Sequence, residues 1–344
     1  MLRRPLAMSA GATRPLAMAA GPITRLSTRR CSMAAPVQLT RHPDGVVQLT
    51  LHRPDKLNSL SLPMFRALQA AARALIPDKS VRAVVMHGEG RAFCAGLDVK
   101  SLASDPLAYR RHLRELLDRP DGEESNLVQD VAYLWRRVPA PVIAAVHGVC
   151  FGGGFQIALG ADIRVAAPAS KFSIMEAKWG LIPDMSATVT LRELVPKDVA
   201  MELTMTGRVF ESKEALRLGL VTRIADDPLA EALALARQIV TRSPDSTAAA
   251  KRLLHATYAE GADEARALRL ETELQRKLML GWNMLACSAK GLGVPPPLQP
   301  GFCARSAVWD EEADEEAEAE VLKLLNDAEN APPSSSKRTP ASCL

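Results

Sequence analysis

The sequence predicts an α/β fold, because short apolar strands alternate with amphipathic helices along much of the chain. Val47, Leu49 and Leu51 alternate with polar residues, which is typical of a half-buried strand. Pro63 lies near the start of a helical pattern, and a continuous apolar run at 83–86 indicates a buried strand. Periodicity alone assigns this fold class and leaves the topology of the sheet open.

Later parts of the chain repeat the alternation and then become helical. Beyond Ser212 nearly every pattern is helical, and Gly219 is a natural end for the first of these helices. The remaining elements are expected as strands at 141–146, 162–166 and 171–173, and as helices at 187–195, 198–206, 228–242, 245–258 and 262–280.

A glycine cluster opens a further predicted helix. Residues 141–162 read PVIAAVHGVCFGGGFQIALGAD: a buried strand, a turn, and a helix that begins around Gly152, Gly153 and Gly154. Without Cβ atoms in the way, a ligand can approach the first backbone N–H groups, which have no partner within the helix. The helix dipole favours negative charge at the same place. The alternative is that these glycines only permit close packing of the helix on the strand.

A second corner of the same kind precedes this one in the chain. Residues 88–99 read GEGRAFCAGLDV and follow the predicted strand at 83–86. Two such corners can direct two N–H groups at one oxygen atom. An oxyanion hole of this kind is often the largest electrostatic contribution in acyl chemistry.

Four motifs carry a resemblance to a known family: RPDKLNSLS at 53–61, RAFCAGLD at 91–98, VHGVCFGGGFQIALGADIR at 146–164 and KFSIMEAKWGLIPD at 171–184. In their order and spacing the chain resembles the crotonase (enoyl-CoA hydratase/isomerase) superfamily. The resemblance implies a ββα spiral core at 37–210. It also implies a helical region at 211–302 that packs across subunits in a homotrimer or homohexamer. The alternative is a helical region that only covers its own core.

The same resemblance implies an acyl-CoA thioester as substrate, with no separate cofactor. The backbone N–H groups of Leu97 and Gly153 would form the oxyanion hole, with Gly154 adjoining, and the charged region 102–137 would cover the acyl end. The substrate-binding positions implied by the family are Lys56, Leu57, Asn58, Ala95, Gly96, Leu97, Asp98, Val99, Gly154 and Gln156.

Carboxylates decide the reaction within this family, because proton transfer needs acids near the reacting carbons. Gln156 stands where the family's hydratases carry one glutamate, and glutamine cannot act as a base. Glu176 matches their second glutamate, and Asp184 resembles an acid used by dienoyl-CoA isomerases. The alternatives are a structural salt bridge for Glu176 and a helix cap for Asp184.

These residues favour an isomerase that resembles dienoyl-CoA isomerases of fatty-acid β-oxidation, with Glu176 and Asp184 as its catalytic residues. The match is partial, because those isomerases also carry an aspartate where this chain has Gln156. A 2-enoyl-CoA hydratase is the second hypothesis, and a non-catalytic RNA-binding or scaffolding relative is the third. Trp179 is expected to pack in the core rather than to line the acyl pocket.

Composition and charge exclude other classes of function. The chain carries a net charge of +4, but residues 1–34 hold six arginines and no acidic residue, so the remainder carries −2. A nucleic-acid surface is therefore not expected. No apolar run approaches the roughly 20 residues that span a bilayer. Six cysteines without paired spacing or neighbouring histidines indicate free thiols and no metal site.

The two ends of the chain differ from its body. Residues 1–34 are rich in Arg, Ala and Ser, which is typical of a mitochondrial transit peptide, with a plastid address or a disordered extension as alternatives. Residues 303–344 form a tail that is acidic and expected to be partly disordered. The terminal Ser-Cys-Leu differs from the peroxisomal Ser-Lys-Leu address, so a peroxisomal location is less expected.

Overall fold

The computed structural model describes residues 35–99, 106–258, 263–279 and 281–306. The predicted transit peptide at 1–34 and the tail from residue 307 onward lie outside the described residues. Between them the chain has the mixed α/β architecture that the sequence predicts.

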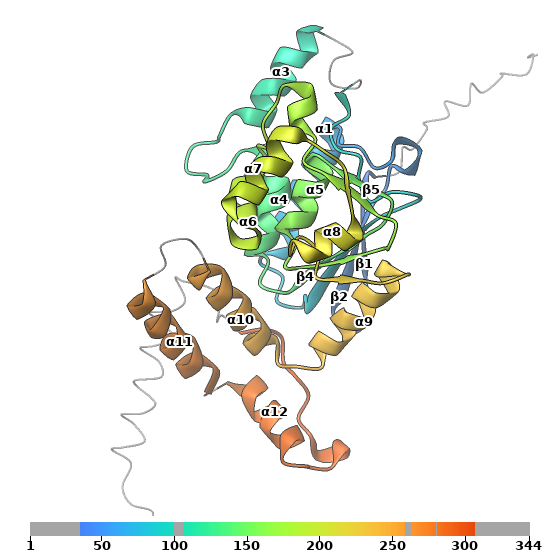
Figure 1. The fold of residues 1–344 in the computed structure, drawn as a ribbon. Coiled ribbons are helices and arrows are strands. Elements are labelled where there is room, and N and C mark those ends of the chain that lie inside the picture. Colours follow the sequence, from blue (N-terminus) through green and yellow to red (C-terminus); the bar gives the residue numbers. More distant parts are fainter. Residues whose placement is uncertain (1–34, 100–105, 259–262, 280, 307–344) are drawn as a thin grey trace, which may run out of the picture. The chain divides into compact units, whose positions relative to one another are not determined.

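The larger sheet has six strands in the order β1-β2-β3-β4-β6-β9 (Figure 1). β1 pairs antiparallel with β2, whereas every other neighbouring pair is parallel. Parallel neighbours need long crossover connections, and most of these contain helices. The strands are β1 (Val37–Arg41), β2 (Val46–Leu51), β3 (Ala83–Gly88), β4 (Val142–Val146), β6 (Ile163–Ala166) and β9 (Arg223–Ile224).

A smaller sheet leads into the segments that carry the glycine cluster and Glu176. Its strands are β5 (Val149–Phe151), β7 (Lys171–Ser173) and β8 (Phe210–Glu211), with β5 parallel to β7 and β7 antiparallel to β8. β5 directly follows β4 of the larger sheet and leads into helix α5. The glycine cluster therefore lies between the first strand of the smaller sheet and α5.

The described helices match the predicted ranges closely up to residue 279. They are α1 (Leu62–Leu75), α3 (Pro106–Leu117), α4 (Leu127–Arg137), α5 (Gly153–Gly160), α6 (Ala187–Leu194), α7 (Lys197–Thr206), α8 (Ser212–Arg217), α9 (Pro228–Val240), α10 (Pro244–Thr257), α11 (Glu264–Met279) and α12 (Trp282–Gly291), with 3-10 turns η1 (Pro54–Lys56), η2 (Glu176–Trp179) and η3 (Pro296–Leu298). Helix α12 was not predicted, because its N-cap is Gly281, which offers no capping side chain.

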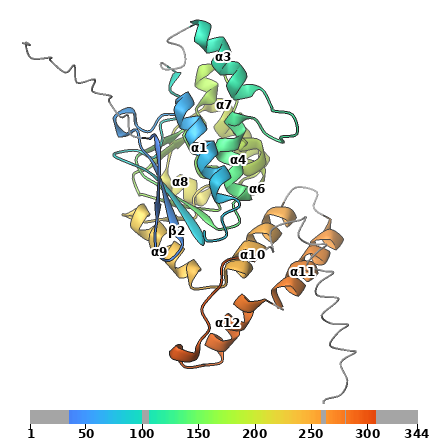
Figure 2. The ribbon, with the colours of Figure 1, turned by 180° about the vertical axis from the view of Figure 1, so that it is seen from behind.

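Helices cover both faces of the larger sheet. Side chains alternate along a strand, so Val84 and Met86 pack in the cluster that includes α1 and α4, whereas Val85 packs with α9. Figure 2 shows α1 and α4 side by side over their face. Burial on both faces explains why β3 and β4 read as continuous apolar runs rather than alternating ones.

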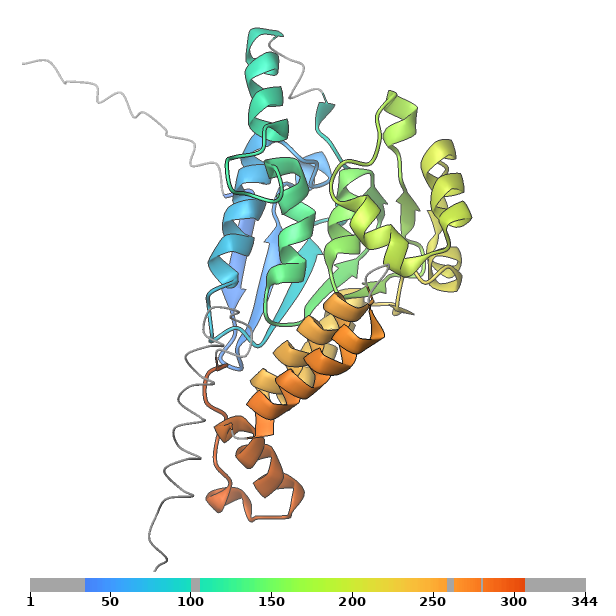
Figure 3. The ribbon, with the colours of Figure 1, turned by 90° about the vertical axis from the view of Figure 1, so that its left-hand side faces the viewer.

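The C-terminal helices form a cluster of their own. α10 and α11 lie side by side (Figure 3) and bury Ala249 and Leu274 between them. α10 is also attached to the core, because Lys251 Nζ donates to the carbonyl oxygens of Trp135 (2.8 Å) and Ala140 (3.1 Å). The predicted role of this region in subunit contacts stays a prediction.

Candidate active site

A cavity of about 600 Å³ opens beyond the carboxyl ends of β3 and β5. It is walled by both glycine corners, by η2 and the loop after it, and by helices α1, α3 and α4. Its lining residues are Phe65, Ala95, Gly96, Leu97, Val99, Leu113, Leu116, Leu117, Val128, Gly152, Gly153, Met175, Glu176, Trp179, Leu181, Ile182, Asp184 and Met185.

Main-chain hydrogen bonds bring the two corners together. Phe93 N donates to His147 O (2.8 Å), Cys94 N donates to Val149 O (3.1 Å), and Phe151 N donates to Cys94 O (3.0 Å). The second corner therefore runs alongside β5 like an added strand. A Cβ on Gly96 would lie 2.8 Å from Phe151 O, so only glycine allows this approach.

The two corners leave two amides without partners. Among the described residues, the N–H groups of Leu97 and Gly153 donate to no protein acceptor. Gly153 is the first residue of α5, where an N–H has no intrahelical partner, and both residues line the cavity. Two unpartnered N–H groups on residues that line one cavity can bind a negatively charged oxygen there.

Close packing also explains part of the glycine cluster. A Cβ on Gly154 would lie 2.6 Å from the Cβ of Cys94, and Gly154 does not line the cavity. The packing alternative therefore applies to Gly154. Gly153 fits both interpretations, close packing and ligand approach. A Cβ there would lie 2.5 Å from Met185 Sδ, and the residue also borders the cavity.

Glu176 is buried against the glycine corner. Its Oε1 accepts a hydrogen bond from Gln156 Nε2 (2.6 Å), whereas its buried Oε2 has no partner among the described residues. Burial raises the pKa of the Glu176 carboxyl, the Gln156 hydrogen bond lowers it in part, and the charge of Asp184 raises it again. The described residues provide no ion pair for Glu176, so the salt-bridge alternative is not supported.

Gln156 connects the two acidic positions. Its Nε2 donates to Glu176, and its Oε1 accepts a hydrogen bond from Met185 N (2.8 Å), the residue next to Asp184. Both ends of the buried amide are thus engaged by the protein. Gln156 lies behind the cavity wall and fixes the positions of residues that form it.

Asp184 lines the same cavity as Glu176 and remains accessible to solvent through it. Partial desolvation by the apolar walls raises the pKa of the Asp184 carboxyl. The N-cap of α6 is Ser186, without a side-chain capping bond, so the helix-cap alternative for Asp184 is not supported. The two carboxyls therefore share one apolar cavity, and both are shifted towards the protonated form.

The rest of the wall is apolar, and one sequence prediction about it is wrong. Trp179 is 62% exposed and lines the cavity, whereas core packing was expected. η2 leaves the ring outside the core because Gly180, in the left-handed conformation, ends the turn directly after it. The sequence prediction named none of the three cavity-lining leucines of α3, although their i, i+3, i+4 spacing marks an apolar face. They are Leu113, Leu116 and Leu117.

Several predicted binding residues lie outside the cavity. These are Lys56, Leu57, Asn58, Asp98, Gly154 and Gln156. The Asn58 side chain is fully buried and donates to Glu89 O (2.9 Å) and Ala92 O (2.8 Å), so it holds its own loop to the turn after β3. The Asp98 carboxylate pairs with Arg53 (3.0 Å). Any contact of these residues with the CoA portion of a substrate stays a prediction.

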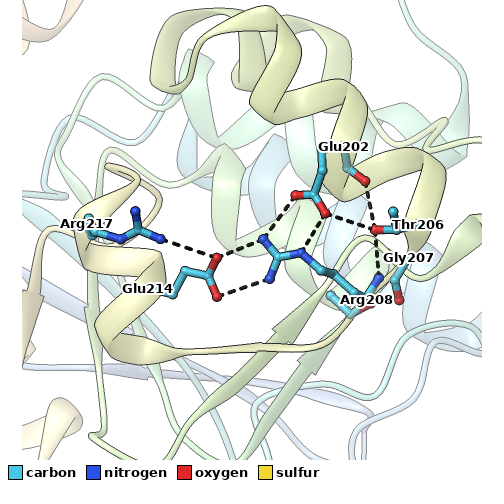
Figure 4. Close-up of polar contacts among 7 residues, drawn as sticks. Glu202, Thr206, Gly207, Arg208, Glu214 and Arg217 are labelled. Carbon is cyan, nitrogen blue, oxygen red and sulfur yellow. Dashed lines mark hydrogen bonds and ion pairs between the residues drawn. The ribbon is translucent and has the colours of Figure 1, made fainter.

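Hydrogen bonds connect the loop after α7 to the glycine corner. Arg208 pairs with Glu202 (2.7 Å) and Glu214 (2.8 Å), which joins α7 to α8 (Figure 4). The neighbouring Gly207 O accepts a hydrogen bond from Ser173 Oγ (2.9 Å), and Ser173 O accepts one from Gly152 N (2.9 Å). A surface ion-pair network is thereby connected to the start of α5.

Over the described part of the chain, no group of three or more His, Cys, Asp or Glu side chains is arranged to hold a metal ion. In the same residues no helix is both long enough and apolar enough to cross a bilayer.

Comparison with known proteins assigns the chain to a family. The sequence profile of the enoyl-CoA hydratase/isomerase family matches residues 41–280. Enoyl-CoA hydratase EchA19 of Mycobacterium tuberculosis is 33% identical over 247 residues, which cover 69% of this chain and 89% of that protein. The 1,2-epoxyphenylacetyl-CoA isomerase of Escherichia coli is 33% identical over 234 residues, covering 67% and 86%.

A solved structure agrees with the sequence match. The crystal structure of an enoyl-CoA hydratase from Mycobacterium smegmatis superposes with a TM-score of 0.64 at 31% identity and covers 75% of this chain and 96% of that one. Two unpartnered amides and two carboxyls beside one apolar cavity are the features expected of an acyl-CoA enzyme site. The chain belongs to the enoyl-CoA hydratase/isomerase family of acyl-CoA enzymes, and its fold is the crotonase spiral expected from the motifs.

Proposed function

We propose that the chain is an acyl-CoA double-bond isomerase that converts 3,5-dienoyl-CoA thioesters into 2,4-dienoyl-CoA thioesters in fatty-acid β-oxidation. The observation that carries this proposal is the pairing of Glu176 and Asp184 in one apolar cavity, next to two unpartnered amides. This double-bond migration removes a proton at C2 and returns one at C6, and two acids placed along the acyl chain can perform it with no other reactant.

The thioester carbonyl oxygen would accept hydrogen bonds from the N–H groups of Leu97 and Gly153. Negative charge develops on that oxygen when the α-proton leaves, and each fixed donor can stabilise the resulting enolate by about 3 kcal/mol. Neither N–H donates to an acceptor among the described residues, which supports this role because none of their hydrogen bonds must break when substrate binds.

Glu176 would remove the proton from C2 through its unpartnered Oε2. The electron pair of that C–H bond forms the enolate, and the conjugated system then takes up a proton at C6 from the protonated Asp184 carboxyl. Glu176 ends protonated and Asp184 ionised, and exchange with water restores both. Raised carboxyl pKa values suit this cycle, since each group must hold a proton for part of it.

Gln156 is the reason to favour isomerisation over hydration. A second carboxylate at this position would help Glu176 to hold and split a water molecule, whereas an amide can only orient Glu176. Its other end holds Met185 N, so one side chain sets the spacing between the segments that carry Glu176 and Asp184.

A 2-enoyl-CoA hydratase is the second candidate. It is favoured by the names of similar proteins, since EchA19 and a probable enoyl-CoA hydratase of Rhizobium meliloti, 36% identical over 239 residues, are both hydratases by name. In that case Glu176 would act with a water held by another group.

Absorbance assays separate the candidates. The purified chain without residues 1–34 is incubated with 3,5-dienoyl-CoA and, separately, with 2-enoyl-CoA. Formation of the conjugated diene that is lost in Asp184→Asn supports the isomerase. Hydration of 2-enoyl-CoA that survives Asp184→Asn and is lost in Glu176→Gln would instead establish the hydratase. Turnover of neither substrate would contradict both and leave a non-catalytic role.

Location and assembly are proposals of the same kind. The arginine-rich segment 1–34 supports import into mitochondria, which cell fractionation of chains with and without this segment would test.

Exposed apolar side chains on the C-terminal helices, such as Leu268 and Leu285, support a homotrimer or homohexamer. Light scattering of the purified protein would give the number of subunits.

A further inference from the structure

A second cavity lies at the opposite end of the larger sheet from the candidate active site. It has a volume of about 370 Å³ and shares no lining residue with that site. Its walls come from three segments: the β1–β2 turn at 41–47, the loop before β3 at 79–82, and the C-terminal segment at 302–304. This volume falls within the roughly 300–1,000 Å³ that small-molecule sites occupy.

The cavity wall is built by a close approach of two segments. Gly45 has a φ of +83°, and a Cβ there would lie 2.4 Å from Arg82 Cγ, so only glycine fits. Arg82 N donates to Gly45 O (2.9 Å), which fixes the arginine against the turn. The position of Arg82 is thus set by backbone contacts rather than by a charged partner.

Arg82 brings to the cavity a positive charge that no carboxylate contacts directly among the described residues. Its NH2 group donates to the carbonyl oxygens of Val240 (3.0 Å) and Arg242 (2.7 Å), and its guanidinium lies 5.3 Å from the centre of the Phe302 ring. Among the described residues no carboxylate forms an ion pair with it. Burial lowers the pKa of Arg82, and the distant charge of Asp245 offsets this only in part.

Two further side chains with hydrogen-bond donors line the cavity. Lys79 is exposed, and the described residues offer it no ion pair. The Nε2 of His42 is buried and has no hydrogen-bond partner within the described ranges.

The remaining charges of the lining are already paired. Arg41 contacts Asp78 (2.8 Å), and Asp44 contacts Arg237 (3.6 Å). The cavity therefore has an excess of two positive charges.

We propose that this cavity is a binding site for an oxyanion, a phosphate or carboxylate group, held by Arg82, Lys79 and His42. A planar guanidinium with free N–H groups binds such groups through charge-assisted hydrogen bonds, and an ammonium adds a mobile positive charge. The site is separate from the thioester cavity and does not depend on the reaction proposed above.

Two sources can supply the oxyanion. One is a small molecule that bears a phosphate. The other is the chain itself, because residues 310–320 contain eight acidic residues and follow the wall segment 302–304 closely in sequence. That wall is fixed in place by Arg305, which is 4% exposed and donates to Pro139 O (2.9 Å) and Val81 O (3.3 Å).

Equilibrium dialysis of the full-length chain against radiolabelled inorganic phosphate, at constant ionic strength, tests the site. We expect one saturable site per chain. Arg82→Gln should weaken binding by about tenfold and Lys79→Gln by about threefold. Lys79 is exposed, so its variant keeps the test valid if Arg82→Gln fails to fold. The matched control is Lys213→Gln, an exposed lysine on α8, which should bind phosphate like the parent chain.

A second full-length chain, with the eight acids of 310–320 replaced by their amides, separates the two sources. Tighter phosphate binding in that chain, or binding seen only there, identifies the chain's own carboxylates as the competing occupant. Equal binding in both chains identifies a free phosphate compound. No saturable binding in either chain, or equal weakening by Lys213→Gln and Lys79→Gln, would overturn the proposal.

Discussion

Glu176 is a buried carboxylate and Asp162 a largely buried one, yet their surroundings are opposite. Asp162 accepts hydrogen bonds from Lys251 Nζ (2.8 Å), His255 Nε2 (2.9 Å) and Val142 N (2.7 Å). Burial would raise the pKa of Asp162, but the charge of Lys251 and the bond from His255 bring it below its ordinary value. Glu176 accepts a side-chain hydrogen bond from Gln156, its Oε2 has no partner in the described part of the chain, and its pKa is raised.

The comparison separates a structural acid from a candidate catalytic one. Asp162 accepts hydrogen bonds from α10 and from the start of β4, and the ammonium of Lys251 balances its charge. Within the described ranges Glu176 has no counter-charge, and its Oε2 accepts no hydrogen bond beside the cavity, which costs stability and makes proton transfer possible. Burial alone therefore does not single out a candidate catalytic carboxylate; burial without a compensating charge does.

The largest expected effect is the loss of proton transfer in Glu176→Gln. The amide keeps the shape of the side chain and cannot accept the α-proton, so exchange at that carbon should fall by about 10⁴-fold. Exchange is measured as deuterium uptake from D₂O into a bound acyl-CoA. A fall of less than tenfold in a folded variant would remove Glu176 from the reaction.

The next effect is on stability and concerns the other carboxylate. Lys251→Met leaves Asp162 without its main counter-charge, and breaking a buried pair on one side costs about 3–5 kcal/mol. Chemical denaturation should show this loss, while Lys213→Met, at an exposed position, should unfold like the parent chain. Equal stabilities for both variants would show that Asp162 does not need Lys251.

A smaller effect distinguishes the two acids by pH. A raised carboxyl pKa in the folded state means that the Glu176 contribution to stability is present at low pH and lost as pH rises through that pKa. Glu176→Gln should therefore be more stable than the parent chain at pH 7, and this advantage should shrink towards pH 4. Asp162, whose pKa is lowered, behaves in the opposite sense and stabilises the fold at neutral pH. Thermal unfolding of the parent chain and of Glu176→Gln between pH 4 and pH 7 measures this difference. An advantage of the variant that grows towards pH 4 would contradict the prediction.

The smallest effect is expected at the surface network of Figure 4. Arg208 is 36% exposed as a side chain and pairs with glutamates that are also partly exposed, so solvent screens the interaction. Arg208→Ala should lower Tm by about 2 °C or less. A much larger fall would mean that the network, through Gly207 and Ser173, carries more of the glycine corner than its exposure indicates.

Local patterns made much of the site predictable. Both glycine corners could be named from local strand–turn–helix patterns, whereas Glu176 and Asp184 could be named because the motif that contains them resembles that of a known family. Whether each glycine serves packing or ligand approach could not be predicted. The contact of Gly154 with Cys94, for example, depends on two segments 60 residues apart that meet in space.

The failures have the same physical origin. Trp179 was assigned to the core because its type favours burial, but a left-handed glycine turns the chain before the ring can pack. Nothing in the sequence links Asp162 to Lys251, which is 89 positions away on a later helix. The double contact of Gln156 was equally unreadable, since it joins three segments through one amide.

The most direct test of the acid pair follows deuterium at two carbons of one substrate. A 3,5-dienoyl-CoA is incubated in D₂O with the parent chain, Glu176→Gln and Asp184→Asn, and label at C2 and C6 is read by NMR. We predict that Asp184→Asn keeps exchange at C2 and loses label at C6, whereas Glu176→Gln loses both. Unchanged label at C6 in Asp184→Asn would contradict a double bond moved between these two carboxyls.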